Sequence, residues 1–405
     1  MSQAKRILVG QSGGPTSAIN ASLAGVIAGA REKGAHAIGM RYGIQGFLDG
    51  RTVDLDQAVP DDDALSLLRD TPASWLGSCR FKLPEPEADP EFFARALERI
   101  DAAGVSAVLY IGGNDSMDTI AKLARYGAQV GSDVRFVGVP KTIDNDLVGT
   151  DHTPGYGSAA RFVATAVAEV ARDADVYDLK SVTFVEIMGR DAGWLAGSAC
   201  LASPDVVLLP EVPLDEDTLM AKVEALLAEK NTVMVATSEG VRDASGRLIA
   251  ERTVAAGTGT DEFGHLAQLS GASRYLAALA KERLGCKTRA VEISTFQRCA
   301  SHCASSTDLD EAFALGHLGA LAALDGQTGV MCAVERTSDD PYRAELRTVG
   351  VADVANKVKP VPREWIAADG MGVTPEFVRY VRPLVAPPEQ IAYEGGLPRQ
   401  MPPLA

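Results

Sequence analysis

Short apolar runs alternate along the chain with longer segments in which apolar residues recur every three or four positions. The runs are rich in β-branched residues and end in Gly, Pro or a polar residue, a pattern that predicts buried strands. Strands are predicted at 5–9, 105–111, 134–139, 181–187, 205–209, 232–237, 289–294 and 328–335, and the main helices at 16–33, 89–103, 155–174, 214–229, 262–284 and 308–324. Because the two kinds of element alternate, the sequence predicts an α/β protein with mainly parallel sheets and helices on both faces.

The length of the chain favours two lobes. At 405 residues it exceeds the size at which a single core stops growing, and 46% hydrophobic residues suffice for two cores. We place one lobe near residues 1–140 and a second near 141–335, with soft boundaries and interleaved segments. Residues 336–405 are rich in proline and show little periodicity apart from a short helix predicted at 374–380. They are therefore expected to wrap over the surface rather than to form a third domain.

The charge of the chain argues against some partners. Its formal net charge is −15, from 39 basic and 54 acidic side chains, which disfavours non-specific binding to nucleic acid or to anionic membranes. No apolar stretch approaches the ~20 residues of a membrane span, and the first residues lead into a strand rather than a signal peptide. A cytoplasmic location is expected.

Six cysteines are scattered along the chain, so reduced thiols are expected. Cys299, His302 and Cys303 share a face if they lie on a helix, but no second Cys or His cluster offers a fourth zinc ligand. The lack of a fourth ligand favours the interpretation that these three are small core residues rather than zinc ligands.

The densest chemistry lies in the heptad of residues 140–146, Pro-Lys-Thr-Ile-Asp-Asn-Asp, which follows the strand predicted at 134–139. The carboxyl end of a strand in such a sheet is where α/β proteins bind ligands. There Lys141 can hold an anion, Asp144 can accept a proton and Asp146 can bind a metal. The alternative is an Asx-rich turn that satisfies only its own backbone, and the heptad alone does not decide between them.

Other predicted strands end in similar groups. The strand at 5–9 leads into Gly-Gln-Ser-Gly-Gly-Pro at 10–15 and then a helix, which together form a seat for an anion. The strand at 105–111 leads into Gly-Gly-Asn-Asp-Ser at 112–116, whose polar residues could also be N-caps. Because the heptad follows the neighbouring strand, Asn114, Asp115, Asp144 and Asp146 can surround a Mg²⁺ ion, which prefers oxygen ligands.

The order of these motifs resembles the phosphofructokinase family. The resemblance covers about residues 5–335, and its most specific pieces are Thr-Ile-Asp-Asn-Asp at 142–146 and Met-Gly-Arg at 188–190. The other pieces are Gly13-Gly14, Gly77-Ser78-Cys79-Arg80-Phe81, Gly112 to Ser116 and Gln297-Arg298. The resemblance implies two Rossmann-like α/β lobes, the first binding the phosphoryl donor and the second the sugar phosphate, with the active site in the cleft between them.

The resemblance also implies roles for individual residues. Asp144 would take the proton of the C1 hydroxyl of fructose 6-phosphate, with Lys141, Thr142 and Arg190 completing the catalytic group. The donor would be held by Gly13, Gly14, Arg80, Gly113, Asp115, Ser116 and Lys141, and the metal, Mg²⁺, by Asp115, Asn114 and Asp146. The sugar phosphate would be held by Thr142, Asp144, Met188, Gly189, Arg190, Glu239 and Arg298, with Arg289 lent by a neighbouring subunit of a homo-oligomer, a dimer or a tetramer.

Two positions bear on the donor. Members that use ATP typically carry Gly where this chain has Asp115 and Lys141, and an added carboxylate would crowd and repel a nucleotide's phosphates. The resemblance thus implies the pyrophosphate-dependent branch, a reversible reaction of glycolysis that yields fructose 1,6-bisphosphate and phosphate. An ATP-dependent enzyme and a non-catalytic sugar-phosphate sensor are the alternatives.

The chain departs from the family pattern at three positions. Asn114 stands where the family usually has a metal-binding Asp. Ser181 stands where members often have a phosphate-binding Arg, and Thr295 stands where a His often contacts the sugar.

Overall fold

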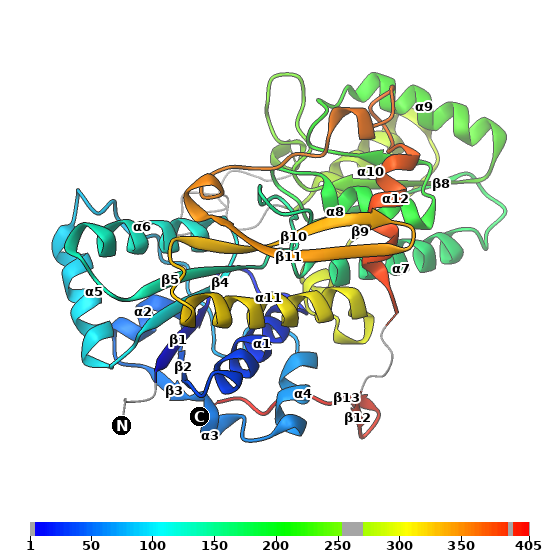
Figure 1. Cartoon of the computed structure of the whole chain (residues 1–405). Coiled ribbons are helices and arrows are strands. Elements are labelled where there is room, and N and C mark those ends of the chain that lie inside the picture. The colour runs from blue at the N-terminus through cyan, green and yellow to red at the C-terminus, as the bar shows by residue number, and fades with distance from the viewer. Residues whose placement is uncertain (1–4, 253–269, 388–391, 405) are drawn as a thin grey trace.

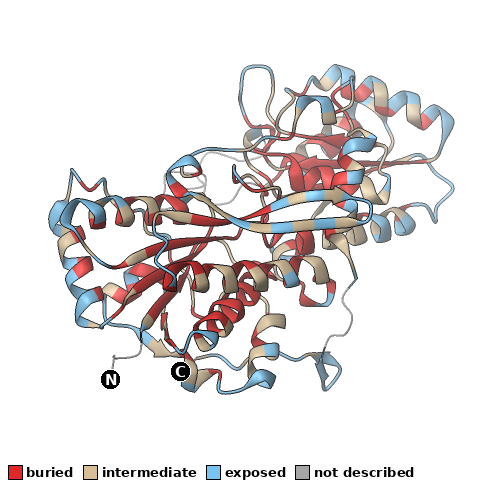
Figure 2. Cartoon of the chain, in the orientation of Figure 1, coloured by how far each residue is buried: buried red, intermediate tan, exposed pale blue. Residues whose placement is uncertain are grey.

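The computed structural model describes residues 5–252, 270–387 and 392–404, and these contain two main sheets, one in each of two lobes (Figure 1), besides a short two-stranded sheet. The larger sheet has the strand order β11-β10-β5-β4-β1-β2-β3. Its strands are β1 (Arg6–Gln11), β2 (His36–Met40), β3 (Thr52–Asp54), β4 (Ala107–Gly112), β5 (Arg135–Pro140), β10 (Val330–Asp339) and β11 (Tyr342–Gly350). All neighbours are parallel except β2 with β3 and β10 with β11. The central strands are buried along nearly their whole length, as expected of parallel strands covered on both faces (Figure 2).

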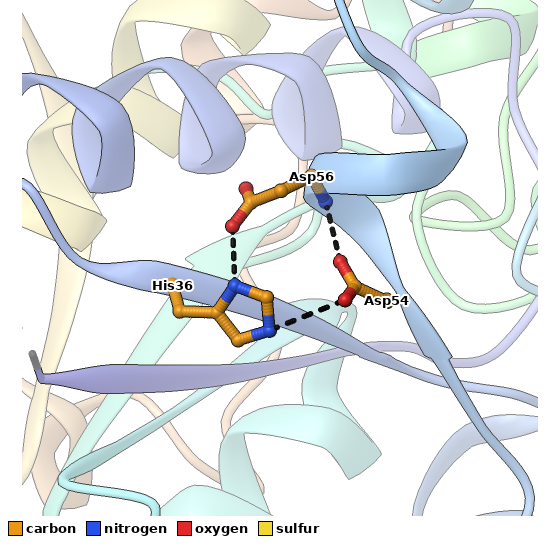
Figure 3. Close-up of side chains that lie close together, drawn as sticks. All are labelled: His36, Asp54 and Asp56. Atoms are coloured by element: carbon orange, nitrogen blue, oxygen red, sulfur yellow. Dashed lines mark hydrogen bonds and ion pairs between the residues drawn. The ribbon is translucent and has the colours of Figure 1, made fainter.

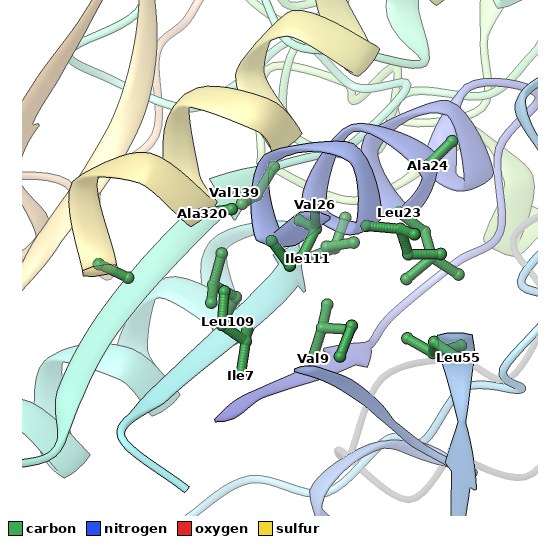
Figure 4. Close-up of a cluster of buried hydrophobic side chains, with 14 of the residues drawn as sticks. Ile7, Val9, Leu23, Ala24, Val26, Leu55, Leu109, Ile111, Val139 and Ala320 are labelled. Atoms are coloured by element: carbon green, nitrogen blue, oxygen red, sulfur yellow. The ribbon is translucent and has the colours of Figure 1, made fainter. Parts of the chain in front are cut away.

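Helices cover both faces of this sheet. They are α1 (Ile19–Glu32), α2 (Gly43–Leu48), α3 (Leu55–Ala58), α4 (Asp62–Asp70), α5 (Pro90–Ala102), α6 (Asn114–Val130) and α11 (Ser306–Leu324). On one face α1 and α11 lie side by side and enclose a core that includes Val9, Leu23 and Leu109 (Figure 4). Their backbones approach closely because a Cβ atom at Gly25 would lie 1.9 Å from the carbonyl oxygen of Phe313. The sequence predicted these two helices but not their contact.

The smaller sheet is parallel throughout, with the order β7-β8-β6-β9. Its strands are β6 (Ser181–Ile187), β7 (Val206–Leu208), β8 (Thr232–Ser238) and β9 (Lys287–Glu292), and its helices are α7 (Tyr156–Ala174), α8 (Trp194–Gly197), α9 (Glu216–Glu229) and α10 (Ala272–Leu284). These strands lie at the predicted places, with ends displaced by at most a few residues. The helix predicted to begin at 262 is found as α10, and the start of that prediction lies outside the described residues.

The chain crosses between the lobes more than once. It leaves the large sheet after β5, builds the small sheet, and returns to the large sheet with α11, β10 and β11. The strand predicted at 328–335 was assigned to the second lobe, 141–335. It is found as β10, which pairs with β5 and therefore belongs to the sheet of the first lobe. Part of the predicted extension, 336–405, is likewise the edge strand β11 of the large sheet.

The rest of the C-terminal segment contacts both lobes: Val351 and Val354 are buried in a core of the first lobe, α12 (Pro375–Val381) packs against the second, and Met401 and Leu404 return to the first. Besides α12 it contains short 3₁₀ turns η5 (Val351–Asp353), η6 (Arg363–Trp365) and η7 (Arg382–Val385), and the two-residue strands β12 (Tyr393–Glu394) and β13 (Leu397–Pro398). Phe377 and Tyr380 of α12 are buried against Trp194 and Trp365. This segment thus contributes to a core, which a surface wrapping would not do. Within the described ranges, no helix is both long and apolar enough to cross a membrane.

Candidate active site

A cavity of about 370 Å³ lies where strands of both sheets end. Loops that follow β1, β4 and β5 line it from the first lobe, and loops that follow β6 and β8 line it from the second. The lining residues are Gly13, Gly14, Pro15, Thr16, Arg80, Gly113, Asn114, Asp115, Ser116, Lys141, Thr142, Ile143, Asp144, Asp146, Met188, Arg190, Asp191, Glu239 and Arg298. The fold therefore brings together nearly all the residues that the sequence singled out, at the carboxyl ends of the strands.

The heptad leaves β5 as a loop whose first residues are fixed by backbone hydrogen bonds. The amide of Lys141 donates to the carbonyl of Gly112 (2.9 Å), and the amide of Thr142 donates to that of Pro154 (3.0 Å). The hydroxyl of Thr142 lies 3.2 Å from the Asp144 carboxylate, to which it donates, and accepts from the Asp144 amide (3.1 Å). The carboxylate of Asp144 is thus held at the cavity wall by its own loop.

Lys141 is buried and spans the gap between the heptad and the glycine-rich loop. Its ammonium donates to the carbonyls of Ser12 (2.9 Å) and Gly14 (2.6 Å). Burial lowers the pKa of Lys141 to about 8; the positive charge of Arg298 acts in the same direction, and the carboxylate of Asp144 opposes it. The glycine-rich loop also lies close to Arg298, since a Cβ atom at Gly14 would lie 3.2 Å from the guanidinium of Arg298. One wall of the cavity is therefore cationic.

Carboxylates crowd another part of the cavity. Burial raises the pKa of Asp144 above its ordinary value, although the Thr142 hydroxyl and the Lys141 charge oppose the rise. Burial and the neighbouring charge of Asp144 raise the pKa of Asp146 to about 7. Burial raises the pKa of Glu239 to about 8. Such groups favour a proton or a metal cation beside them.

The polar residues at the start of α6 do not cap the helix, although the alternative interpretation of this loop had suggested that they would. The N-cap is Gly113, and no side chain caps the helix. Asn114 instead binds the C-terminal segment: its amide nitrogen donates to the carbonyl of Lys357 (2.6 Å), and its amide oxygen accepts from the amide of Asn356 (2.8 Å). Asp115 is exposed at the cavity. Of the two neighbours, Asp115 offers the charged oxygens.

The second lobe supplies Met188, Arg190 and Glu239. The backbone at Gly189 has φ +133°, which disfavours other residues, and its amide donates to the Glu239 carboxylate (3.3 Å). Gly189 does not line the cavity itself; it holds Glu239 in place. Asp191 was not among the predicted site residues. It also lines the cavity, and it directly follows the Met-Gly-Arg motif.

Arg289 stands apart from the other predicted residues. It lies on β9, the edge strand of the small sheet, and pairs with Asp173 on α7, with both side chains exposed. It does not line the cavity of its own chain.

Another polar cluster was not predicted. His36, Asp54 and Asp56 are the one group of three possible ligands close enough to share a metal in the part of the chain that the structure describes. Figure 3 shows the imidazole between the two carboxylates, with its Nε2 atom 3.5 Å from Asp54. Asp54 also caps α3 through its other oxygen. The cluster lies at the beginning of β2, whereas the cavity lies at the strand ends, and its geometry is that of a half-buried ion-pair network.

The cysteines near 300 do not form one helical face. Residues 294–303 are two 3₁₀ turns, η3 (Ser294–Arg298) and η4 (Ser301–Cys303), in which Cys303 is buried while His302 is exposed. The expected helix is absent because the turn instead carries Arg298 to the cavity.

Comparison with known proteins agrees with this geometry. A family model described as phosphofructokinase matches residues 6–319. A pyrophosphate–fructose 6-phosphate 1-phosphotransferase from Xanthomonas campestris pv. campestris is 40% identical over 402 residues, which cover 97% of this chain and 94% of that protein. One from Methylococcus capsulatus is 39% identical over 98% of this chain and 95% of that protein.

A crystal structure of a pyrophosphate-dependent phosphofructokinase from Nitrosospira multiformis superimposes with a TM-score of 0.87 at 34% identity, covering 98% of this chain and 95% of that one. The predicted fold of two α/β lobes with mainly parallel sheets is confirmed. The resemblance carried by the strand-end motifs is confirmed with it: the chain belongs to the phosphofructokinase family.

Proposed function

We propose that this enzyme transfers a phosphoryl group reversibly from pyrophosphate to the C1 hydroxyl of fructose 6-phosphate, giving fructose 1,6-bisphosphate and phosphate. The observation that carries the proposal is the buried ammonium of Lys141, which is fixed between the heptad and the glycine-rich loop. The names of the most similar relatives support the same donor. The cytoplasm is the expected location.

Asp144 is the proposed base. Its carboxylate lies at the cavity wall beside Thr142, which orients it through a hydrogen bond. An ordinary Asp has a pKa of ~4 and is a weak base at neutral pH, so its placement matters. Burial raises the pKa of Asp144 in the structure, so basicity contributes as well. A higher pKa brings the base nearer to the operating pH, where proton transfer is most effective.

The donor end of the cavity suits a small, highly charged anion. Lys141 and Arg80 supply positive charge, and the glycine-rich loop leads into α1, whose N-terminus favours anions. Asp115 stands in the same cavity and would repel the additional phosphate of a nucleotide. Phosphoryl transfer depends mainly on positioning and electrostatics, so a fixed, partly desolvated ammonium is an effective partner for the transferred group.

A divalent cation is proposed to bind beside the carboxylates of the same cavity. Asp115 and Asp146 would hold it. Burial, together with the negative charge of Asp144, raises the pKa of Asp146, and a bound cation would favour its ionised form. Asn114 is a weaker candidate because its amide oxygen already accepts a hydrogen bond from Asn356. We propose Mg²⁺, which keeps several waters and uses one or two carboxylates plus phosphate oxygens. When bound, it would neutralise charge on the phosphoryl oxygens.

The second lobe is the proposed sugar-phosphate site. Met188, Arg190 and Glu239 line the cavity from the second lobe, and Arg298 lines it beside the glycine-rich loop. Gly189 positions Glu239 through its amide. In the bound state a protonated Glu239 could donate to a sugar hydroxyl, and an ionised one could accept, since burial raises its pKa to about 8.

A homo-oligomer is proposed from the position of Arg289. It is not among the residues that line the cavity of its own chain, and its strand β9 is an open edge of the small sheet. Val176, Tyr177 and Leu179 nearby are exposed apolar residues, which are uncommon as a group on a monomer. A second copy covering this face would receive Arg289. A dimer or tetramer in light scattering supports this, and an active monomer contradicts it.

The donor is tested with purified enzyme, fructose 6-phosphate and Mg²⁺, supplied with either pyrophosphate or ATP. Formation of fructose 1,6-bisphosphate with pyrophosphate alone, and its reversal by added phosphate, supports the proposal. Turnover with ATP and none with pyrophosphate would identify the ATP-dependent alternative. Binding of fructose 6-phosphate without turnover on either donor would identify a sugar-phosphate sensor.

A further inference from the structure

The middle residue of the heptad turns away from the cavity. Asn145 is completely buried and has φ +55°, a left-handed conformation that few residue types other than Gly adopt readily. Its amide nitrogen donates to the hydroxyl of Tyr380 (2.7 Å), and its amide oxygen accepts from the amide of Thr153 (3.0 Å). Its neighbours Asp144 and Asp146 face the cavity instead. Asn145 thus anchors the loop from behind.

The partner of Asn145 comes from the C-terminal segment, 235 residues further along the chain. The Tyr380 hydroxyl accepts from Asn145 and donates to the carbonyl of Asp151 (2.9 Å), so both of its hydrogen-bonding roles are used on the loop that leaves the heptad. A single hydroxyl therefore ties together the two ends of the segment 145–151.

The ring of Tyr380 has little freedom to move. Its centroid lies 5.2 Å from that of Trp194 and 5.3 Å from that of Trp365, and the guanidinium carbon of Arg336 lies 4.6 Å from it. Such packing and the cation–π contact hold the ring in one place. The position of the hydroxyl, and with it that of Asn145, is set by a core of the second lobe.

A second contact from the same segment supports the loop. The amide of Lys359 donates to the carbonyl of Asp146 (2.7 Å), and its ammonium donates to the carbonyls of Thr150 (3.2 Å) and Asp151 (2.7 Å). Its own carbonyl accepts from the indole of Trp194 (2.8 Å). The heptad is therefore supported from behind at Asn145 and at Asp146, both times from the C-terminal segment.

We propose that Tyr380 is a positioning residue for phosphoryl transfer, acting through Asn145 to keep the Asp144 carboxylate directed at the substrate hydroxyl. The inference rests on the proposed function, in which Asp144 is the base. The backbone dihedral angles of Asn145 set the relative directions of Asp144 and Asp146. Without the hydroxyl, the buried amide nitrogen of Asn145 loses its partner, and the loop can relax toward a conformation that is less strained and less well aligned.

The test is Tyr380→Phe, which removes the hydroxyl and keeps the ring. The matched control is Tyr156→Phe, because Tyr156 is equally buried in the same core, with its ring 6.5 Å from that of Tyr380, but its hydroxyl donates to the carbonyl of Trp194 (3.1 Å). We expect Tyr380→Phe to lower kcat about tenfold to a hundredfold, as a misplaced catalytic group does. The KM for fructose 6-phosphate should stay within about twofold, because most of the proposed sugar contacts, Met188, Arg190, Glu239 and Arg298, lie outside the heptad. Tyr156→Phe should leave kcat nearly unchanged.

Thermal unfolding separates positioning from stability. Tyr380→Phe removes two buried hydrogen bonds and Tyr156→Phe removes one, so Tm should fall somewhat more in Tyr380→Phe. A loss of kcat in Tyr380→Phe alone, with both variants fully folded at the assay temperature, supports the inference. Equal kcat values in the two variants overturn it. If the wild-type enzyme transfers no phosphoryl group from either donor, the proposed function fails instead, and this outcome is recognised before any variant is made.

A double-mutant cycle with Asn145→Gly tests the path of the effect. Glycine tolerates the left-handed conformation and removes the side chain that binds Tyr380. If Tyr380 acts through Asn145, the double variant has nearly the same kcat as Asn145→Gly alone. Multiplicative losses in kcat would mean that Tyr380 acts by another route and would overturn the inference.

Discussion

Replacing Lys141 by Met tests the donor site most directly. Met keeps an unbranched apolar stem and removes the charge. A unit charge about 4 Å from another contributes roughly 4 kcal/mol at an effective dielectric constant near 20. Lys141 is buried at the donor end of the cavity, so we expect kcat/KM for pyrophosphate to fall about a hundredfold to a thousandfold at pH 7.

The pH dependence makes this prediction specific. Burial lowers the pKa of Lys141 to about 8. Only about one tenth of the free enzyme then carries the ammonium at pH 9. Since kcat/KM reports groups of the free enzyme, the wild-type value for pyrophosphate should fall about tenfold more than that of the Lys141→Met variant between pH 7 and pH 9. Comparison with the variant removes the titration of pyrophosphate itself.

Initial rates are measured at saturating fructose 6-phosphate, so that groups on the sugar side are occupied. Met also leaves the carbonyls of Ser12 and Gly14 without their donor, so thermal unfolding is measured alongside. Lys141→Gln, which keeps an N–H donor without the charge, serves as a second variant. A constant wild-type-to-variant ratio across the pH range, or a defect confined to fructose 6-phosphate, would refute the assignment of Lys141 to the donor.

Three further outcomes are expected. Asp144→Ala should reduce kcat to a trace while calorimetry still detects fructose 6-phosphate binding; retained turnover would exclude Asp144 as the base. Asp115→Gly combined with Lys141→Gly should increase kcat/KM for ATP and decrease it for pyrophosphate in parallel donor assays; no gain with ATP would mean that donor choice lies elsewhere. Burial opposes the charged form of His152, but the carboxylates of Glu311 and Asp151 outweigh it and raise its pKa to about 9. His152 should therefore contribute roughly 3 kcal/mol below pH ~6.5, lost as the pH rises through about 9; denaturant unfolding should show this slope in the wild type and not in His152→Gln.

The strand ends could be predicted from the sequence because their signal is local. A short apolar run followed at once by Gly, Asp, Lys or Arg is legible without knowing the tertiary structure, and parallel strands bring such ends to one edge. The heptad, the loop at 112–116 and the Met-Gly-Arg motif were found in this way, and all three border the cavity. Asp191 was missed although it directly follows the last motif.

Other elements could not be predicted from the same kind of pattern. The helix α4 has nine residues and is polar overall, so its few apolar residues were outweighed by the acidic stretch around them, and the cap at Asp61 was the remaining signal. The strand β11 alternates half-buried and exposed residues from Tyr342 onward. We interpreted this stretch as part of a proline-rich tail because the prolines that follow it dominate the composition. Period-two alternation was the available signal.

The C-terminal segment shows a more general reason for such misses. Its contacts with the heptad are made by one Tyr hydroxyl and by the backbone amide of Lys359, whose ammonium binds carbonyls of the loop that follows the heptad. None of these contacts leaves a recognisable pattern in the sequence, because a backbone carbonyl can accept a hydrogen bond whatever the type of its residue. Functional support of this kind becomes visible only when the chain is folded.

The charge of the cavity explains why an acidic protein can use an anionic substrate. Four cationic side chains line it, Arg80, Lys141, Arg190 and Arg298, together with five carboxylates, Asp115, Asp144, Asp146, Asp191 and Glu239. The net charge of −15 acts mainly over the surface, where salt screens it within about 10 Å. The cavity itself would still be net negative if every group ionised normally. Burial raises the pKa values of Asp146 and Glu239 to about 7 and 8, so protons offset part of this charge before substrates bind.

Pyrophosphate adds several negative charges to the same volume, so its binding requires either more protons or a divalent cation. The carboxylates that repel a bare anion are thus the same groups that favour a metal-bound one.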